Sequence, residues 1–177
     1  MATDIVIKKI EAADTKQIAE MIFENNLGYW SESDLEQEID RQDSISLAAV
    51  KNKEIVGFVV ARLITSHHFD LKINSKNKEQ CHLKVKNQPV EIEIYNIAVK
   101  KQHWRRGIGK LLIEKLIRNS ASNIAAILWL EVRETNFPAI NFYKSNDFNV
   151  CYKRKNFYIN PTEDAIVMKL ETLETKD

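Results

Sequence analysis

The feature that most constrains the fold is a strand that leads through a basic, glycine-containing turn into a helix. Residues 91–99 alternate in polarity and then become apolar, as a strand entering a core does. Residues 107–120 carry apolar side chains at helical spacing, and residues 126–132 form a second apolar strand. This order predicts two parallel neighbouring strands joined by a right-handed helical crossover.

The turn between the first strand and the helix has the chemistry of an anion site. The start of a helix presents backbone N–H groups without partners, and the helix dipole adds partial positive charge there. Gly107 and Gly109 permit close approach to the backbone, while Arg105, Arg106 and Lys110 add full charges. A phosphorylated ligand suits such a site, although the pattern alone also fits a solvated basic turn. It is neither a dinucleotide fingerprint nor a Walker loop, since the required further residues are missing.

The rest of the chain predicts one domain of mixed α/β class. The 177 residues are enough to bury a substantial core. Asp14 and Ser31 are predicted to cap two helices, and a third short helix is expected at 137–145. Residues 65–89 are rich in Asn, Lys, Ser and His, and they predict a long loop or hairpin inserted into the domain. Further strands are predicted at 5–10, 45–50, 55–64, 148–154 and 165–170.

Charge and composition exclude several classes of function. The net charge is +1, so the overall field gives no reason to expect nucleic-acid binding. No apolar run approaches the ~18 residues of a membrane span, and the N-terminus lacks the layout of a secretion signal. Cys81 and Cys151 are far apart, which favours reduced thiols in a cytoplasmic protein. His67, His68 and His82 have no acidic or Cys partner at regular spacing, so we expect no metal site.

Two side chains in the C-terminal half are candidates for proton transfer. Glu131 ends an otherwise apolar strand, where a carboxylate is costly to desolvate unless it is paired or near water. It could be a general base, or it could pair with Arg133 or be solvated. Tyr143 could be a core residue of its helix, or it could donate a proton to a thiolate leaving group. Asn136 could cap that helix or hydrogen-bond a ligand amide.

Taken in order, the motifs of residues 91–170 resemble the GNAT acetyltransferase superfamily. Within it, the chain most resembles the bacterial ribosomal-protein alanine N-acetyltransferases of the RimI type. Before residue 91, Gly28-Tyr29-Trp30-Ser31-Glu32 is similar to an aromatic-Trp-Ser turn of that family. The motifs that carry the likeness are Asn96-Ile97-Ala98-Val99, Arg105-Arg106-Gly107-Ile108-Gly109, Leu130-Glu131-Val132-Arg133, Asn136, Ala139-Ile140, Phe142-Tyr143 and Glu163-Asp164-Ala165.

The resemblance implies a GNAT fold: a mixed, mostly antiparallel sheet with a central parallel pair splayed to admit acetyl-CoA, and helices on both faces. It implies acetyl transfer from acetyl-CoA to the N-terminal amine of a protein, an alanine of a small-subunit ribosomal protein, without a metal. Glu131 is then the general base and Tyr143 the general acid, with Glu91 and Glu93 in reserve as bases.

The resemblance also assigns binding residues. The acceptor is expected to contact Tyr29, Trp30 and Tyr158. Residues 97–99 would offer backbone groups to the pantetheine arm, and residues 105–110 would hold the pyrophosphate. The predicted cofactor-binding residues are Ile97, Ala98, Val99, Arg105, Arg106, Gly107, Ile108, Gly109, Lys110 and Asn136.

Several positions depart from the family pattern. Trp104 stands where Gln or Arg is usual, Phe157 replaces a Tyr, and Asn146-Asp147 replaces a Leu-Gly turn. Two alternatives to protein acetylation stay open. A small amine such as a polyamine would suit an acidic cluster near the acceptor side, unless that cluster is a solvated helix face. The other is a module that binds CoA without turnover. The acidic cluster comprises Glu32, Asp34, Glu36 and Glu38.

Overall fold

One seven-stranded sheet runs through the molecule in the order β1-β2-β3-β4-β5-β7-β6. The computed structural model describes residues 5–25, 27–28, 30–64, 89–120 and 125–172. Within them β4 and β5 form the parallel pair, and the other neighbouring strands are antiparallel. The elements are β1 Val6–Lys9, η1 Ala12–Asp14, α1 Thr15–Glu24, α2 Glu32–Ile39, β2 Ser44–Lys51, β3 Glu54–Ile64, β4 Val90–Val99, η3 Lys101–His103, α3 Ile108–Ser120, β5 Ala126–Arg133, α4 Phe137–Lys144, β6 Asn149–Ile159 and β7 Thr162–Thr172.

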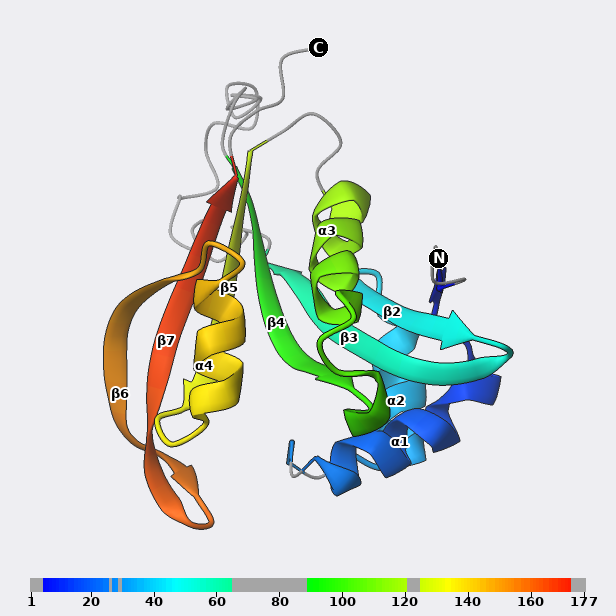
Figure 1. Cartoon of the computed structure of the whole chain (residues 1–177), viewed down its shortest axis with the longest axis horizontal. Coiled ribbons are helices and arrows are strands. Elements are labelled where there is room, and N and C mark those ends of the chain that lie inside the picture. The colour runs from blue at the N-terminus through cyan, green and yellow to red at the C-terminus, as the bar shows by residue number, and fades with distance from the viewer. Residues whose placement is uncertain (1–4, 26, 29, 65–88, 121–124, 173–177) are drawn as a thin grey trace, which may run out of the picture.

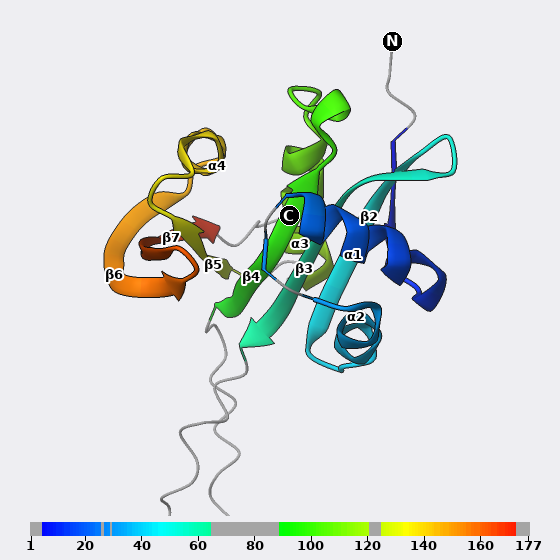
Figure 2. The same ribbon diagram turned by 90° about the horizontal axis from the view of Figure 1, so that it is seen from below.

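Helices cover both faces of the sheet, which confirms the predicted fold class. In Figure 1, α3 and α4 lie in front of the sheet and α1 and α2 behind it. Figure 2 shows α2 and α4 on opposite sides. On the front face, Leu112 and Leu116 of α3 belong to one buried cluster with Leu128 of β5. On the back face, Ile18 of α1 and Phe58 of β3 belong to a second buried cluster.

The beginnings of the first two helices follow their sequences closely. Ser31 accepts a hydrogen bond from the Asp34 backbone N–H at 3.1 Å, and the Asp34 carboxylate accepts one from the Ser31 N–H at 2.8 Å. This reciprocal box confirms Ser31 as the cap of α2. Asp14 precedes α1 as predicted, but its side chain makes no cap hydrogen bond to that helix. It accepts from the Glu11 N–H at 2.9 Å instead, and so closes η1.

Strand ends differ from the predicted ones where the apolar pattern is weak. The β2–β3 turn has two central residues, Asn52 and Lys53, both with positive φ, whereas the predicted strands leave residues 51–54 between them. Such tight hairpin turns need left-handed backbone, which asparagine tolerates. Strand β6 continues five residues beyond Arg154, to Ile159. Because almost all of β6 is exposed, its sequence lacks the alternation that marks a strand.

The predicted insertion at 65–89 lies outside the described residues except for Pro89. The same holds for Cys81 and for the three histidines considered as metal ligands, His67, His68 and His82.

Candidate active site

The centre of the sheet opens between β4 and β5. Their parallel pairing ends at Ile94 opposite Leu130, although both strands continue beyond these residues. Figure 1 shows β4 and β5 diverging along their length. Opposite β3, the register shifts so that Tyr95 is an extra residue of β4, and such a bulge bends a strand. The β5-facing edge of residues 97–99 is therefore free of a strand partner within the described chain.

The glycine turn follows the end of β4, beyond the point where its pairing with β5 stops. Gly107 has φ +78°, and a Cβ added there would meet no atom within 4 Å. Glycine is thus required by backbone conformation, and the space beside it is open. Arg105, Arg106 and Lys110 are exposed, whereas the Ile108 side chain is buried in the core. Only the backbone of Ile108 is therefore available to a ligand.

Gly109 has a different reason to be glycine. An added Cβ would lie 2.7 Å from Cζ of Phe142 on α4. The sequence suggested that Gly109 admits a ligand to the backbone, but the structure shows that it also admits a side chain of the neighbouring helix. The absent side chain lets α3 and α4 approach each other.

Trp104 is hydrogen-bonded to the last residue of β4. Its indole Nε1 donates to the Val99 carbonyl oxygen at 2.6 Å. One of the backbone acceptors predicted for the pantetheine arm therefore already has a donor in this structure. The indole itself is exposed.

Glu131 lies on the sheet face opposite α3 and α4. Its neighbours Leu130 and Val132 point into the core cluster beneath α3 and α4, so Glu131 points to the opposite face. Its carboxylate accepts a hydrogen bond from Arg154 of β6 at 2.6 Å. The alternative of a Glu131–Arg133 pair is wrong, because Arg133 pairs with Glu163 at 3.1 Å.

Tyr143 lies on the other face, buried against Phe142 and Phe148 with ring centroids 5.3 and 5.5 Å away. Burial raises the pKa of the Tyr143 phenol well above its usual value, and the nearby Tyr158 adds to the rise. Burial also raises the pKa of Tyr158, Arg133 lowers it, and the Glu131 carboxylate raises it. Tyr158 of β6 is therefore within electrostatic reach of both Tyr143 of α4 and Glu131 of β5.

Asn136 caps α4, with its side-chain oxygen accepting from the Ala139 N–H at 3.2 Å. The capping alternative raised by the sequence is thus confirmed. The amide nitrogen of Asn136 is not used in that contact.

A hollow of about 250 Å³ opens beside Glu131 on the face away from α3 and α4. Glu91 accepts from the Trp129 indole there at 3.0 Å, and Glu93 accepts from the Tyr95 hydroxyl at 2.8 Å. The hollow is lined by Ile64, Glu91, Glu93, Trp129, Leu130, Glu131, Tyr152 and Val167. A second hollow of about 320 Å³ beside α1 contains none of the predicted site residues.

The predicted acceptor residues are only partly described. Trp30 is half-buried and its ring lies 6.4 Å from that of Tyr95, while Tyr29 lies outside the described residues. Sequence reasoning assigned no role to Arg154 or Tyr95. Trp129 was detectable, because it stands two residues before Glu131 and a strand repeats its faces every two residues.

The acidic residues of α2 are not a free cluster. Asp34 belongs to the capping box, and Glu38 is buried against Arg62 of β3. This occupation disfavours a polyamine pocket on α2. Across the described ranges there is no group of His, Cys, Asp and Glu suited to a metal, and no helix long and apolar enough to cross a bilayer.

Comparison with known proteins agrees with this geometry. Residues 15–148 match the acetyltransferase (GNAT) family, and the chain belongs to that family. It is 44% identical over 84 residues to the [Ribosomal protein bS18]-alanine N-acetyltransferase of Salmonella typhimurium, which covers 45% of this chain and 55% of that protein. It thus spans only about half the length of that relative. Over 166 residues it is 29% identical to the protein of the same name from Haemophilus influenzae, covering 92% and 96% of the two chains.

Solved structures share the fold. The ribosomal-protein-S18-alanine N-acetyltransferase from Escherichia coli superposes with a TM-score of 0.72 at 24% identity, covering 98% of this chain and 97% of that one. Arabidopsis thaliana NAA60 in complex with acetyl-CoA gives 0.74 at 22% identity, with 95% and 99% covered.

Proposed function

We propose that this protein transfers the acetyl group of acetyl-CoA to the N-terminal α-amine of a protein. We further propose that the acceptor is an N-terminal alanine of a small-subunit ribosomal protein, which would place the reaction in the cytoplasm. The observation that carries the proposal is the gap beyond Ile94 and Leu130, with the glycine turn following β4. Glu131 follows Leu130 on one face of the sheet, and Tyr143 belongs to the core cluster on the other face. The ribosomal acceptor is supported by the names of the bacterial relatives.

The residues present fit acetyl-CoA as co-substrate. An extended pantetheine arm can hydrogen-bond to the free edge of residues 97–99 in the manner of an added strand. The open backbone at Gly107 and the exposed Arg105, Arg106 and Lys110 suit a pyrophosphate. The co-substrate supplies an acyl group already activated as a thioester, so the reaction needs no covalent enzyme intermediate and no metal.

Glu131 would act on the acceptor amine. An N-terminal amine has a pKa of about 8, so most of it is protonated at neutral pH and cannot attack. Glu131, directly or through a water, would take the proton from this ammonium group. The nitrogen would then attack the acetyl carbon and form a tetrahedral intermediate. This intermediate would collapse with cleavage of the carbon–sulfur bond, while the nitrogen loses its second proton to water. A backbone N–H near Val99 would stabilise the oxyanion of the tetrahedral intermediate.

Tyr143 would donate its phenolic proton to the departing thiolate and would then be reprotonated from water. Of the two protons that leave the nitrogen, one is thus matched by the proton on the CoA thiol and one is released. Because burial raises its pKa, the phenol keeps this proton throughout the neutral range. The two proton-transfer groups lie on opposite faces of the sheet, so the acceptor would enter from the Glu131 face and acetyl-CoA from the face covered by α3 and α4. The two substrates would meet in the gap.

The test uses acetyl-CoA with two probes, a peptide beginning with alanine and spermidine, and follows release of the CoA thiol. We expect turnover with the peptide and none with spermidine. The protein is then incubated with acetyl-CoA and small-subunit ribosomal proteins, and mass spectrometry should find one newly acetylated N-terminus. Turnover with spermidine alone would support the small-amine alternative. CoA binding without turnover on any amine would support a non-catalytic module.

A further inference from the structure

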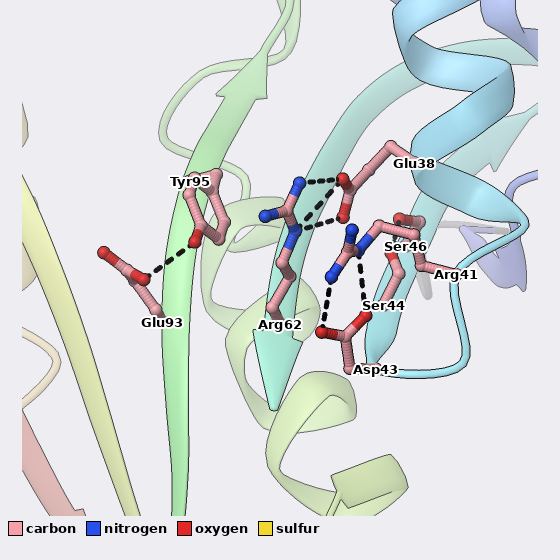
Figure 3. A network of polar contacts seen from close by, with 8 residues as sticks. All are labelled: Glu38, Arg41, Asp43, Ser44, Ser46, Arg62, Glu93 and Tyr95. Carbon is pink, nitrogen blue, oxygen red and sulfur yellow. Dashed lines mark hydrogen bonds and ion pairs between the residues drawn. The ribbon is translucent and has the colours of Figure 1, made fainter. Parts of the chain in front are cut away.

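We infer that Tyr95 contacts the first residues of the acceptor peptide, and that the buried ion pair of Arg62 with Glu38 holds Tyr95 in position for this contact. The inference rests on the proposed function and adds to it a specificity-determining residue and its positioning residue. Figure 3 shows the network that links them.

The network begins at a buried carboxylate. Glu38 of α2 is only 3% exposed, and its two oxygens accept from Nε of Arg62 at 2.9 and 3.1 Å. Nη2 of Arg62 also donates to Glu38. Such a forked contact fixes the plane of the guanidinium as well as its place.

Stability alone is a poor reason for this pair. The free energy needed to remove two charges from water offsets much of their mutual attraction. Well-packed apolar residues at the same positions often stabilise a core equally well. A buried ion pair has a clearer purpose when its fixed orientation positions a third side chain. Here the third group is the ring of Tyr95.

Tyr95 is the extra residue of the β4 bulge, so regular strand pairing does not fix its side chain. Three contacts hold it instead. The Arg62 guanidinium carbon lies 4.6 Å from the ring centroid, and Trp30 packs at 6.4 Å. The hydroxyl donates to Glu93 at 2.8 Å. Although it is held in this way, the side chain remains 40% exposed.

The exposed part of Tyr95 lies beside the proposed reaction centre. Its partner Glu93 lines the same hollow as Glu131. An acceptor whose amine reaches Glu131 must lay its following residues over this face of the sheet. The rings of Tyr95 and Trp30 provide apolar contact there, and the phenol provides a hydrogen-bonding group, which together suit an extended peptide.

The charged side chains beside the Tyr95 and Trp30 rings are paired with one another. Glu38 pairs with Arg62, and the neighbouring Asp43 pairs with Arg41 at 2.7 Å. These two carboxylates, Glu38 and Asp43, are therefore already paired and are not available to a polycation. The Arg41–Asp43 pair is forked like the first but more exposed, which makes it a matched control (Figure 3).

The experiment compares the wild type with Arg62→Gln, Tyr95→Leu, the double variant, and the control Arg41→Gln. An alanine-starting peptide is the probe, and KM is measured separately for peptide and acetyl-CoA, together with CoA binding and Tm. We expect each single variant to raise the peptide KM about tenfold, the scale of one interface contact, with the acetyl-CoA KM unchanged. The double variant should be no worse than Tyr95→Leu, because Arg62 acts through Tyr95. Arg41→Gln should match the wild type.

The inference is overturned if Tyr95→Leu keeps the wild-type peptide KM, or if the effects of the two substitutions add. Should Arg62→Gln fail to fold because Glu38 is left unpaired, Tyr95→Leu alone still decides, since that side chain is partly exposed. Wild-type turnover with unaffected variants overturns this inference and leaves the proposed function standing. A wild type that neither binds nor acetylates the peptide overturns both.

Discussion

The Arg154 guanidinium donates to the Glu131 carboxylate at 2.6 Å, and so connects β6 to the proposed base on β5. Arg154 also lies over the Phe157 ring, 4.2 Å from its centroid. The carboxylate is 21% exposed and the arginine 49%, so the pair borders solvent. A carboxylate can accept several hydrogen bonds, which leaves Glu131 able to receive the acceptor ammonium beside Arg154 or in its place.

Replacing Glu131 by Gln should lower kcat at neutral pH by about 10²–10⁴-fold, the usual contribution of a general base. Gln retains an oxygen for Arg154, so the strands should stay in place. CoA affinity, measured by calorimetry, should be nearly unchanged, because Glu131 faces away from the helices beside the glycine turn. An unchanged rate would remove Glu131 from the base role and direct attention to Glu91 and Glu93.

Tyr143→Phe should reduce kcat by about 10²-fold or more, since it removes the general acid and little else. The ring contacts with Phe142 and Phe148 remain, so Tm should change little. The raised pKa means that the wild-type phenol stays protonated to higher pH than an ordinary tyrosine. The wild-type rate should therefore show no loss due to Tyr143 below about pH 10. Equal rates for the two proteins would contradict the assignment.

Gly109→Ala should lower the free energy of unfolding by about 1–3 kcal/mol, the usual cost of overpacking. The new Cβ would lie 2.7 Å from the Phe142 ring, so the ring or the helix that carries it must shift. A second substitution, Phe142→Leu, should recover part of this loss in urea unfolding.

The control for this prediction is Gly107→Ala. Its Cβ would meet nothing within 4 Å, and its cost would come only from the backbone at φ +78°. Phe142→Leu should therefore not rescue it. Rescue of both variants, or of neither, would show that the Phe142 contact is not the cause.

Glu163 should make stability depend on pH in the acid range. The backbone N–H of Thr135, at 2.7 Å, and then the Arg133 guanidinium lower the pKa of Glu163. Because the folded pKa lies below the unfolded value of about 4.3, the contribution is complete above that pH and is lost as the pH falls toward the folded value. Wild-type Tm should therefore fall more steeply than that of Glu163→Gln between about pH 6 and pH 3. Parallel curves would contradict this.

Much of the fold was predictable because its signals are local. The Ser31 cap, the α3 apolar face and the left-handed turn tolerated by Asp147, at φ +66°, all depend on residues close together in the chain. The full length of β6 was not predictable in this way. β6 is held as a strand by its pairing with β7, and its exposed side chains carry no pattern that would predict this.

The sequence by itself determined the strand–turn–helix junction, the family resemblance and the residue types able to bind a phosphate or move a proton, because spacing along the chain suffices for these. Only the tertiary structure decided that Glu131 pairs with Arg154 rather than Arg133, that Glu38 is buried under Arg62, and that Gly109 makes room for Phe142. Each of these contacts joins elements far apart in the chain. Their partners are selected by strand order and helix packing, which no local pattern encodes.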